Sequence, residues 1–405
     1  MAKGVLFIFL GSLFSQVIPF LALPILSNLY TPLEFGFYST ILAWVGVLSA
    51  VAFLRYEVAI VTVGKERHAR AILYFCQKFK FIVFVVMVLI SSVLYLVIRD
   101  GLLIFIPVAL YFSMSYILKE KVLNREQGYG VLSLGRIIKS SVECFVSLGF
   151  GYFAISEFGL VYGVIAGFSA GAFFLAYSSE VTTSSFKKGY VAQVLQRYSD
   201  FPKYSAPQAL LNNLTTNSLI LLIPFFYGSH ILGVFAFGYK IVQAPLGIIS
   251  KAIQVVLYRH ITKKINNRES VLKELFGFIF VLSFLCIIIV FLMYNLDKIF
   301  TFFFDETWSE GARYIKILTP WLIVSFFGSQ FSFFPIVLGE QKKSMFFEFF
   351  YFLSRTLPFL ILWVSGEDDF ELLLYMISWM SSSISFFILL WYAKLWYQYE
   401  KSLGM

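Results

Sequence analysis

The sequence predicts an all-α integral membrane protein with about twelve transmembrane helices. Of its 405 residues, 59% are apolar and only 14% are charged, against roughly 45–50% and 25% in soluble domains. Apolar runs of the length that a helix needs to cross a bilayer, about 20 residues, recur along the whole chain. Short polar breaks separate these runs. The composition excludes a soluble globular protein, and the short breaks leave no room for a large aqueous domain.

Six apolar runs occupy the N-terminal half. The first has no charged residue over positions 4–29 and is too long for the apolar part of a signal peptide, so we expect it to remain as the first span. The six runs lie at about 4–29, 37–62, 81–98, 101–118, 133–155 and 159–178.

A long polar break separates these runs from six more. The later runs lie at about 206–227, 231–257, 275–296, 317–338, 344–364 and 371–393. The expected organisation is an N-terminal six-helix bundle (1–178), a linker (179–204), a C-terminal six-helix bundle (205–396) and a short tail (397–405).

Loop charges predict which side of the membrane each break faces. If the N-terminus is cytoplasmic, the breaks on that side hold 22 of the 32 Lys and Arg residues, and the outer breaks hold four. With 9 and 11 acids respectively, the cytoplasmic breaks net 22 minus 9, or +13, and the outer breaks net 4 minus 11, or −7. Because Lys and Arg accumulate in cytoplasmic loops, we expect the linker, the tail and both termini in the cytoplasm. The excess of basic over acidic residues is thus explained by membrane topology and predicts no nucleic acid partner.

The two halves share a short pattern at equivalent loops. Tyr30 and Gly36 lie between the first two runs, and Tyr227 and Gly233 lie between the seventh and eighth, with the same interval of six residues. Six spans separate the copies, so both halves have the same orientation, which predicts two pseudo-symmetric bundles around a central cavity. The alternative is that the pattern recurs by chance in an aromatic-rich chain.

Nine charged residues fall inside the predicted spans. A charge at the bilayer centre costs roughly 2.5–3.5 kcal/mol on insertion scales, so these side chains are expected to face a wet cavity or a partner. The cations are Arg55, Arg136, Lys139, Lys240, Lys251 and Arg355, and the acids are Glu57, Glu143 and Glu348. Six cations minus three acids gives a net lining charge of +3, which favours an anionic ligand.

Structural roles are the alternative for part of this set. Lys139 and Arg355 can pair with Glu143 and Glu348 on their own helices, and Arg136 can extend to the interface. Such contacts account for three cations and leave a positive lining. We therefore favour a functional role for Arg55, Lys240 and Arg355.

Two further features concern the seventh and eighth spans. Asn213 and Asn217 are four residues apart on one helical face, where their amides can bind sugar hydroxyls or phosphate oxygens, or equally can bond a neighbouring helix. Pro245 lies inside the eighth span and predicts a kink that can act as a hinge.

No pattern for catalysis is found. His68, His230 and His260 have no acid or cysteine at ligand spacing, which predicts no metal site, and no G-x-x-x-x-G-K-[ST] motif is present for ATP. A membrane-embedded polymerase or ligase would be expected to have a large outer loop, whereas the longest outer break is 297–315. We expect a protein that is not an enzyme.

Four segments in order give the chain a family resemblance. They are Asn-Leu-Tyr-Thr-Pro-Leu-Glu-Phe-Gly at 28–36, Arg-Tyr-Glu at 55–57, Phe-Pro-Lys-Tyr-Ser-Ala-Pro at 201–207 and Phe-Asp-Glu-Thr-Trp-Ser-Glu-Gly at 304–311. With them the chain resembles the Wzx-type polysaccharide-repeat (O-antigen) flippases of the multidrug/oligosaccharidyl-lipid/polysaccharide (MOP) exporter superfamily.

The resemblance implies translocation of a polyprenyl-diphosphate-linked oligosaccharide from the inner to the outer leaflet of the bacterial cytoplasmic (inner) membrane by alternating access. It implies that Arg55 and Lys240 engage the diphosphate and that H⁺ or Na⁺ entry drives transport, without any other cofactor. Expected partners are membrane lipids, the lipid-linked oligosaccharide and other polysaccharide-assembly membrane proteins.

The residues assigned to these roles form two sets. The substrate-binding candidates are Arg55, Lys139, Lys240, Lys251, Arg355, Asn213 and Asn217, and the ion-coupling candidates are Glu57, Glu143 and Glu348. A multidrug or cation antiporter of the same superfamily is the alternative function, but its cavity would be expected to be acidic. A polymerase or ligase is the less favoured alternative.

Overall fold

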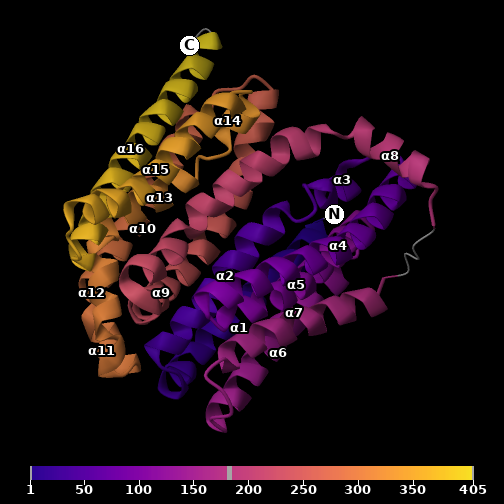
Figure 1. Ribbon diagram of the computed structural model, residues 1–405. Coiled ribbons are helices and arrows are strands. Elements are labelled where there is room, and N and C mark those ends of the chain that lie inside the picture. The colour runs from indigo at the N-terminus through magenta and orange to yellow at the C-terminus, as the bar shows by residue number, and fades with distance from the viewer. Residues whose placement is uncertain (1, 180–184, 404–405) are drawn as a thin grey trace. The chain divides into compact units, whose positions relative to one another are not determined.

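The computed structural model describes residues 2–179 and 185–403, and over these residues it contains helices and no strand (Figure 1). Contacts divide the chain into two compact units, Met1–Leu221 and Leu222–Met405. Positions 180–184 of the predicted linker and 404–405 of the predicted tail lie outside the described residues. The predicted boundaries at residues 178 and 205 stay a prediction.

The first unit contains the N-terminal helices and the beginning of a very long ninth helix. Its elements are α1 (Ala2–Leu29), α2 (Pro32–Val51), α3 (Tyr56–Thr62), α4 (Glu66–Ile98), α5 (Leu102–Arg125), α6 (Tyr129–Tyr152), α7 (Gly159–Tyr177), α8 (Lys188–Arg197), the π-helical η1 (Phe201–Ser205) and the start of α9 (Ala206–Asn266).

The second unit contains the rest of α9 and seven further α-helices. These are α10 (Leu272–Tyr294), α11 (Leu296–Phe303), α12 (Ser309–Ile317), α13 (Thr319–Ser329), α14 (Phe334–Val337), α15 (Gln341–Ser365) and α16 (Phe370–Ser402), with the 3₁₀-helix η2 (Glu306–Trp308) between α11 and α12.

The helices account for the twelve predicted spans. By length and composition, ten helical stretches of the described chain can cross a membrane. One of them, Phe201–Ile265, contains Gly228 with φ 83° and ψ 165°, where the predicted break at 228–230 divides it into two spans. α6 is not among the ten because it carries three charged residues, but its 24 residues are enough to cross. Counting α9 twice and adding α6 to the ten gives twelve, which confirms the predicted all-α membrane fold.

The second predicted span, 37–62, is wrong as a continuous helix. α2 ends at Val51 and α3 begins at Tyr56, and the intervening Leu54 and Arg55 have φ values of 53° and 64°. These left-handed dihedrals are unfavourable for residues with a side chain and end the helix. The apolar run continues through this turn, so hydropathy alone does not detect it.

The predicted linker contains a helix, α8, that packs on α3 and α4 within the first unit. Val194 of α8 lies in the same buried cluster as Cys76 of α4. The Tyr56 hydroxyl donates a hydrogen bond to the Leu195 carbonyl at 2.9 Å, and His68 lies 3.0 Å from the Tyr198 hydroxyl. These contacts hold α8 against α3 and α4.

Helices α6 and α7 approach one another until their backbones touch. Gly163, Gly167 and Gly171 recur every four residues on α7 and so share one face. A Cβ atom at Gly167 would lie 2.7 Å from the Lys139 carbonyl oxygen, and one at Gly163 would lie 2.8 Å from that of Glu143. Small residues at this spacing allow close helix packing in membranes. The close packing of α6 on α7 therefore fixes the position of the α6 face that carries Lys139 and Glu143.

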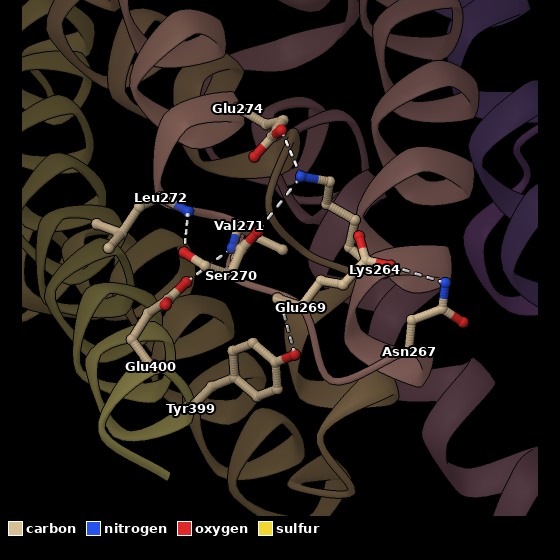
Figure 2. A network of polar contacts seen from close by, with 9 residues as sticks. All are labelled: Lys264, Asn267, Glu269, Ser270, Val271, Leu272, Glu274, Tyr399 and Glu400. Atoms are coloured by element: carbon tan, nitrogen blue, oxygen red, sulfur yellow. Dashed lines mark hydrogen bonds and ion pairs between the residues drawn. The ribbon is translucent and has the colours of Figure 1, made fainter. Parts of the chain in front are cut away.

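In the second unit, the loop between α9 and α10 is bound to the end of α16 (Figure 2). The Glu400 carboxylate is buried and accepts a hydrogen bond from the Val271 backbone N–H at 2.8 Å. The Tyr399 hydroxyl donates to the Glu269 carbonyl at 3.0 Å, and Lys264 of α9 pairs with Glu274 of α10. The loop is thus held by polar contacts on both sides.

Candidate functional site

Arg55 lies in the turn between α2 and α3, where it is the residue immediately before α3. Its Nη1 atom is 3.6 Å from Glu57 Oε1. The Arg55 side chain is 32% exposed, whereas that of Glu57 is 4% exposed. Glu57 therefore pairs with an arginine whose side chain stays partly exposed, and the turn places this ion pair where the apolar run is interrupted.

Arg125 at the end of α5 holds the other end of α3. Its Nη1 atom donates to the carbonyls of Ile60 at 2.8 Å and Val63 at 2.6 Å. Carbonyl groups at the C-terminal end of a helix have no backbone N–H partner within the helix. A cation at a helix C-terminus is also favoured by the helix dipole. Arg125 thus positions the short helix that follows Arg55. The sequence shows it only as one loop cation among many.

Lys139 and Glu143 of α6 form an ion pair, with Lys139 Nζ donating to Glu143 Oε2 at 3.2 Å. The Tyr38 hydroxyl of α2 donates to the other carboxylate oxygen, also at 3.2 Å. Lys139 Nζ further lies 4.3 Å from the centre of the Phe168 ring, a cation–π contact. The positive charge of Lys139 is therefore largely balanced within the first unit. Tyr38 is a member of this group that sequence reasoning missed.

Arg136 makes its contacts with other helices of the first unit. It pairs with Glu120 of α5 and donates to the Ser12 hydroxyl of α1. Glu120 follows the fourth predicted span (101–118), so the extension of Arg136 to the interface stays a prediction. The chain position of Glu120, sixteen residues away, gave no indication of this pairing.

The two asparagines bond to their own helix. Asn213 Nδ2 donates to the Ala209 carbonyl at 2.8 Å, and Asn217 Nδ2 donates to the Asn213 carbonyl at 2.9 Å. Asn217 faces α2 at Gly46, where a Cβ atom would lie 3.6 Å from its Nδ2. Their role in substrate binding stays a prediction.

The remaining candidates lie in the second unit. Along α9, Lys240 is half-buried and Lys251 is exposed. Pro245 is exposed, and Gly228 is the residue of α9 with non-helical dihedrals, so the helix continues through the proline and its hinge role stays a prediction. Glu348 is half-buried on α15.

Arg355 of α15 is 6% exposed and lies against two aromatic rings. Its guanidinium carbon is 4.4 Å from the centre of the Tyr351 ring and 4.6 Å from that of Trp321 on α13. The Tyr351 hydroxyl accepts a hydrogen bond from Trp321 Nε1 at 2.6 Å and lies 2.9 Å from Ser325 Oγ. Tyr351 is one helical turn before Arg355, a spacing visible in the sequence, whereas Trp321 is on another helix.

A cavity of about 210 Å³ adjoins this group within the second unit. It is bordered by α9, α13 and α15 and is lined by Gln243, Leu246, Gly247, Ser250, Trp321, Leu322, Ser325, Phe326, Ser329, Tyr351 and Arg355. Its polar side chains are hydroxyls, an amide and one cation. Such a lining is suited to binding a polar ligand by hydrogen bonds.

Removing the Glu143 charge tests the pair on α6. We expect Glu143→Gln to lower the melting temperature, because it leaves the partly buried Lys139 without its counter-charge. The loss in the free energy of unfolding should be somewhat less than the roughly 3–5 kcal/mol that breaking a fully buried ion pair costs. The Lys139→Gln/Glu143→Gln double variant should recover most of the loss. The measurement is thermal unfolding of the purified protein in detergent. Equal melting temperatures for the wild type and Glu143→Gln would contradict a stabilising role for the pair.

The sequence matches the model of one family, described as polysaccharide biosynthesis protein, over residues 25–313. No curated protein matches it. The solved structures that share the fold include the following three. A structure of the lipid II flippase MurJ in an inward closed conformation is 13% identical, with coverage of 99% of this chain and 92% of that one and a TM-score of 0.72.

The other two are transporters of the MOP superfamily. An inward-facing multidrug resistance MATE transporter is 16% identical, with 98% and 96% of the two chains covered and a TM-score of 0.61. A transporter from Pyrococcus furiosus is 14% identical, with 98% and 96% covered and a TM-score of 0.58. At these identities the likeness concerns the fold. The chain therefore belongs to the family of polysaccharide biosynthesis proteins and is a multi-pass membrane protein with the fold of the MOP transporter superfamily.

Proposed function

We propose that this protein is a flippase that moves a polyprenyl-diphosphate-linked oligosaccharide, an O-antigen or capsule repeat unit, from the inner to the outer leaflet of a bacterial cytoplasmic membrane. The observation that carries the proposal is the excess of six cations over three acids inside the predicted spans of a chain from a polysaccharide biosynthesis family. The loop charges support cytoplasmic termini.

The physical task is to take a diphosphate through a region without water. An anion that leaves water must exchange its hydration for other strong interactions. Charge-assisted hydrogen bonds from Arg and Lys supply these, and the planar guanidinium can bind a phosphate through two parallel bonds. The polyprenyl tail needs no such help, since it can remain in the lipid while the headgroup moves.

Arg55 is the first candidate to hold the diphosphate. It remains partly exposed beside its anchor Glu57, and it lies in an interrupted helix. Irregular backbone at membrane depth is tolerated where it borders protein or water rather than lipid. Lys240 is the corresponding candidate on α9, and Lys139, Lys251 and Arg355 add to the positive charge.

We further propose that transport is coupled to entry of H⁺ or Na⁺. The acids inside the predicted spans, Glu57, Glu143 and Glu348, are the candidates to carry the ion. Glu57 is the most buried of the three. Other membrane proteins of polysaccharide assembly are proposed partners.

The likeness to multidrug transporters favours one second candidate, a drug or cation antiporter. A cationic drug would bind best where acids predominate, because opposite charge offsets the loss of hydration. The net charge of the intramembrane residues is six minus three, or +3, which favours the anionic substrate.

The test is transfer of lipid-linked oligosaccharide across reconstituted vesicles. We expect Arg55→Gln to reduce the transfer rate about tenfold or more, since a hydrogen bond to a charged group contributes roughly 1.5–3 kcal/mol. Arg55→Lys should retain more activity, because it keeps the charge and loses only the forked geometry. Melting temperatures are measured beside the rates to separate binding from folding.

Lys343→Gln is the matched control, since the Lys343 side chain is 61% exposed and pairs with the neighbouring Glu340. It should transfer at the wild-type rate. Normal transfer by Arg55→Gln would refute a diphosphate site at this turn. Absence of transfer by the wild type, together with efflux of cationic drugs, would replace the flippase by the antiporter.

A further inference from the structure

We propose that the cavity beside Arg355 in the second unit binds one sugar ring of the lipid-linked headgroup, an inference that rests on the proposed function. The cavity has a volume of about 210 Å³. An apolar cavity of about 150 Å³ accepts benzene, whereas drug-sized ligands occupy about 300 Å³ or more. The space therefore fits one six-membered ring with its hydroxyls and excludes a whole oligosaccharide.

The polar groups of the cavity come from three helices. They are Gln243 and Ser250 of α9, Ser325 and Ser329 of α13, and Tyr351 and Arg355 of α15. Gln243 of α9 is exposed, whereas Trp321 of α13 and Arg355 of α15 are 1% and 6% exposed. The cavity thus runs from an exposed amide to a buried cation.

The hydroxyls of the cavity are oriented by the protein. Gln330 is fully buried, and its Nε2 atom donates to Ser250 Oγ at 2.8 Å. The second Nε2 proton is shared between the Phe326 carbonyl at 2.9 Å and Ser329 Oγ at 3.0 Å. Because Ser250 accepts the first bond, it keeps its own proton to donate. Ser329 donates to the Phe326 carbonyl at 2.8 Å and keeps a lone pair that can accept. The cavity therefore offers donors and acceptors together.

This mixture distinguishes a sugar from the other charged or polar ligands of a flippase. An ionised phosphate is only an acceptor and would leave the Ser329 lone pair unmatched. A cationic ligand would bind best to carboxylates, and none of the described residues that line the cavity is acidic. A sugar hydroxyl both donates and accepts, so it matches Ser250 and Ser329 at once.

Arg355 contributes a donor of fixed orientation. Its guanidinium lies against the Tyr351 and Trp321 rings, and Tyr351 is itself fixed by the Trp321 indole. A guanidinium held in this way loses little conformational freedom on binding. It can serve neighbouring hydroxyls of one ring, and equally a ring carboxylate.

Gly247 provides a way to fill the cavity without disturbing the helix. It lines the space, and a Cβ atom there meets nothing within 4 Å. Leucine is also a better helix former than glycine. Gly277→Leu is the matched control, because Gly277 is an exposed residue of α10 that likewise meets nothing within 4 Å and does not line the cavity.

The experiment measures binding of two lipids to the purified full-length protein in detergent: lipid-linked oligosaccharide extracted from cells, and polyprenyl diphosphate of the same chain length without sugar. We expect Gly247→Leu and the Ser250→Ala/Ser329→Ala variant to weaken binding of the oligosaccharide lipid about tenfold, the effect of losing one or two hydrogen bonds. Binding of the sugarless lipid should not change. Gly277→Leu should bind both lipids as the wild type does.

Unchanged binding of the oligosaccharide lipid by Gly247→Leu and by the double serine variant would overturn the sugar site while leaving the flippase intact. Equal weakening of both lipids would also overturn it, since the cavity would then serve the diphosphate. If the wild type binds neither lipid, the proposed function fails and the sugar site fails with it. Thermal unfolding of each variant identifies any loss of binding that is caused by loss of fold.

Discussion

Gly167→Val is expected to separate α6 from α7 and to lower the melting temperature of the protein. A Cβ atom at Gly167 would lie 2.7 Å from the Lys139 carbonyl oxygen and 2.9 Å from the Glu143 Cβ. The first of these is a backbone atom, which cannot move aside without moving its helix. Overpacking of a well-packed region costs about 1–3 kcal/mol and occasionally more, and here it also displaces Lys139 and Glu143.

The measurement is thermal unfolding and yield of the purified variant. Gly149→Val is the control, because Gly149 is a glycine of α6 at which a Cβ atom meets nothing within 4 Å. The two variants carry the same chemical change and the same change in helix propensity. If they unfold at the same temperature, the close approach of α6 and α7 does not stabilise the protein.

Trp308→Ala is also expected to destabilise the protein strongly, with a loss of about 3–5 kcal/mol in the free energy of unfolding. Trp308 is 1% exposed, and its ring centre lies 4.1 Å from that of Phe237 on α9. The following helix, α12, packs on α9 through Gly311 and Gly238, where a Cβ atom at Gly238 would lie 2.7 Å from the Gly311 carbonyl oxygen. Alanine would leave a cavity where these helices join.

Trp308→Phe is the graded control, since it keeps an aromatic ring against Phe237 and should lose less than the alanine variant. Denaturant or thermal unfolding measures whether Trp308→Phe loses less stability than Trp308→Ala. Trp308 also lies in the 304–311 segment that carried the family resemblance. Wild-type stability with loss of transport in Trp308→Ala would show that this segment binds substrate rather than joining helices.

The spans could be predicted because their length and apolar character are local properties. The break at 228–230 corresponds to Gly228, where the left-handed φ of 83° is tolerated because glycine has no side chain. The turn before α3 could not be predicted in the same way. Leu54 and Arg55 adopt positive φ without a glycine or proline to mark the turn.

Partners on the same helix could also be predicted, and partners on other helices could not. Lys139 and Glu143 are four residues apart, which brings their side chains together on any helix. Arg136 pairs with Glu120 across a helix boundary, and this depends on how α5 and α6 pack. The same holds for Trp321 beside Arg355. The charged candidates could therefore be named from the sequence, but their surroundings depend on tertiary contacts, and their roles in transport stay predictions.

The bond between Glu400 and Val271 has a consequence for the order in which the chain is built. The two residues are 129 positions apart, so α10 and its preceding loop are synthesised long before their partner exists. Since chains are made from the N-terminus at about 5–20 residues per second, the Val271 N–H must remain hydrated, or otherwise bonded, for seconds. The hydrogen bond to this loop can form only after residue 400 has been added. The polar contacts of the loop therefore form at a late step of membrane insertion.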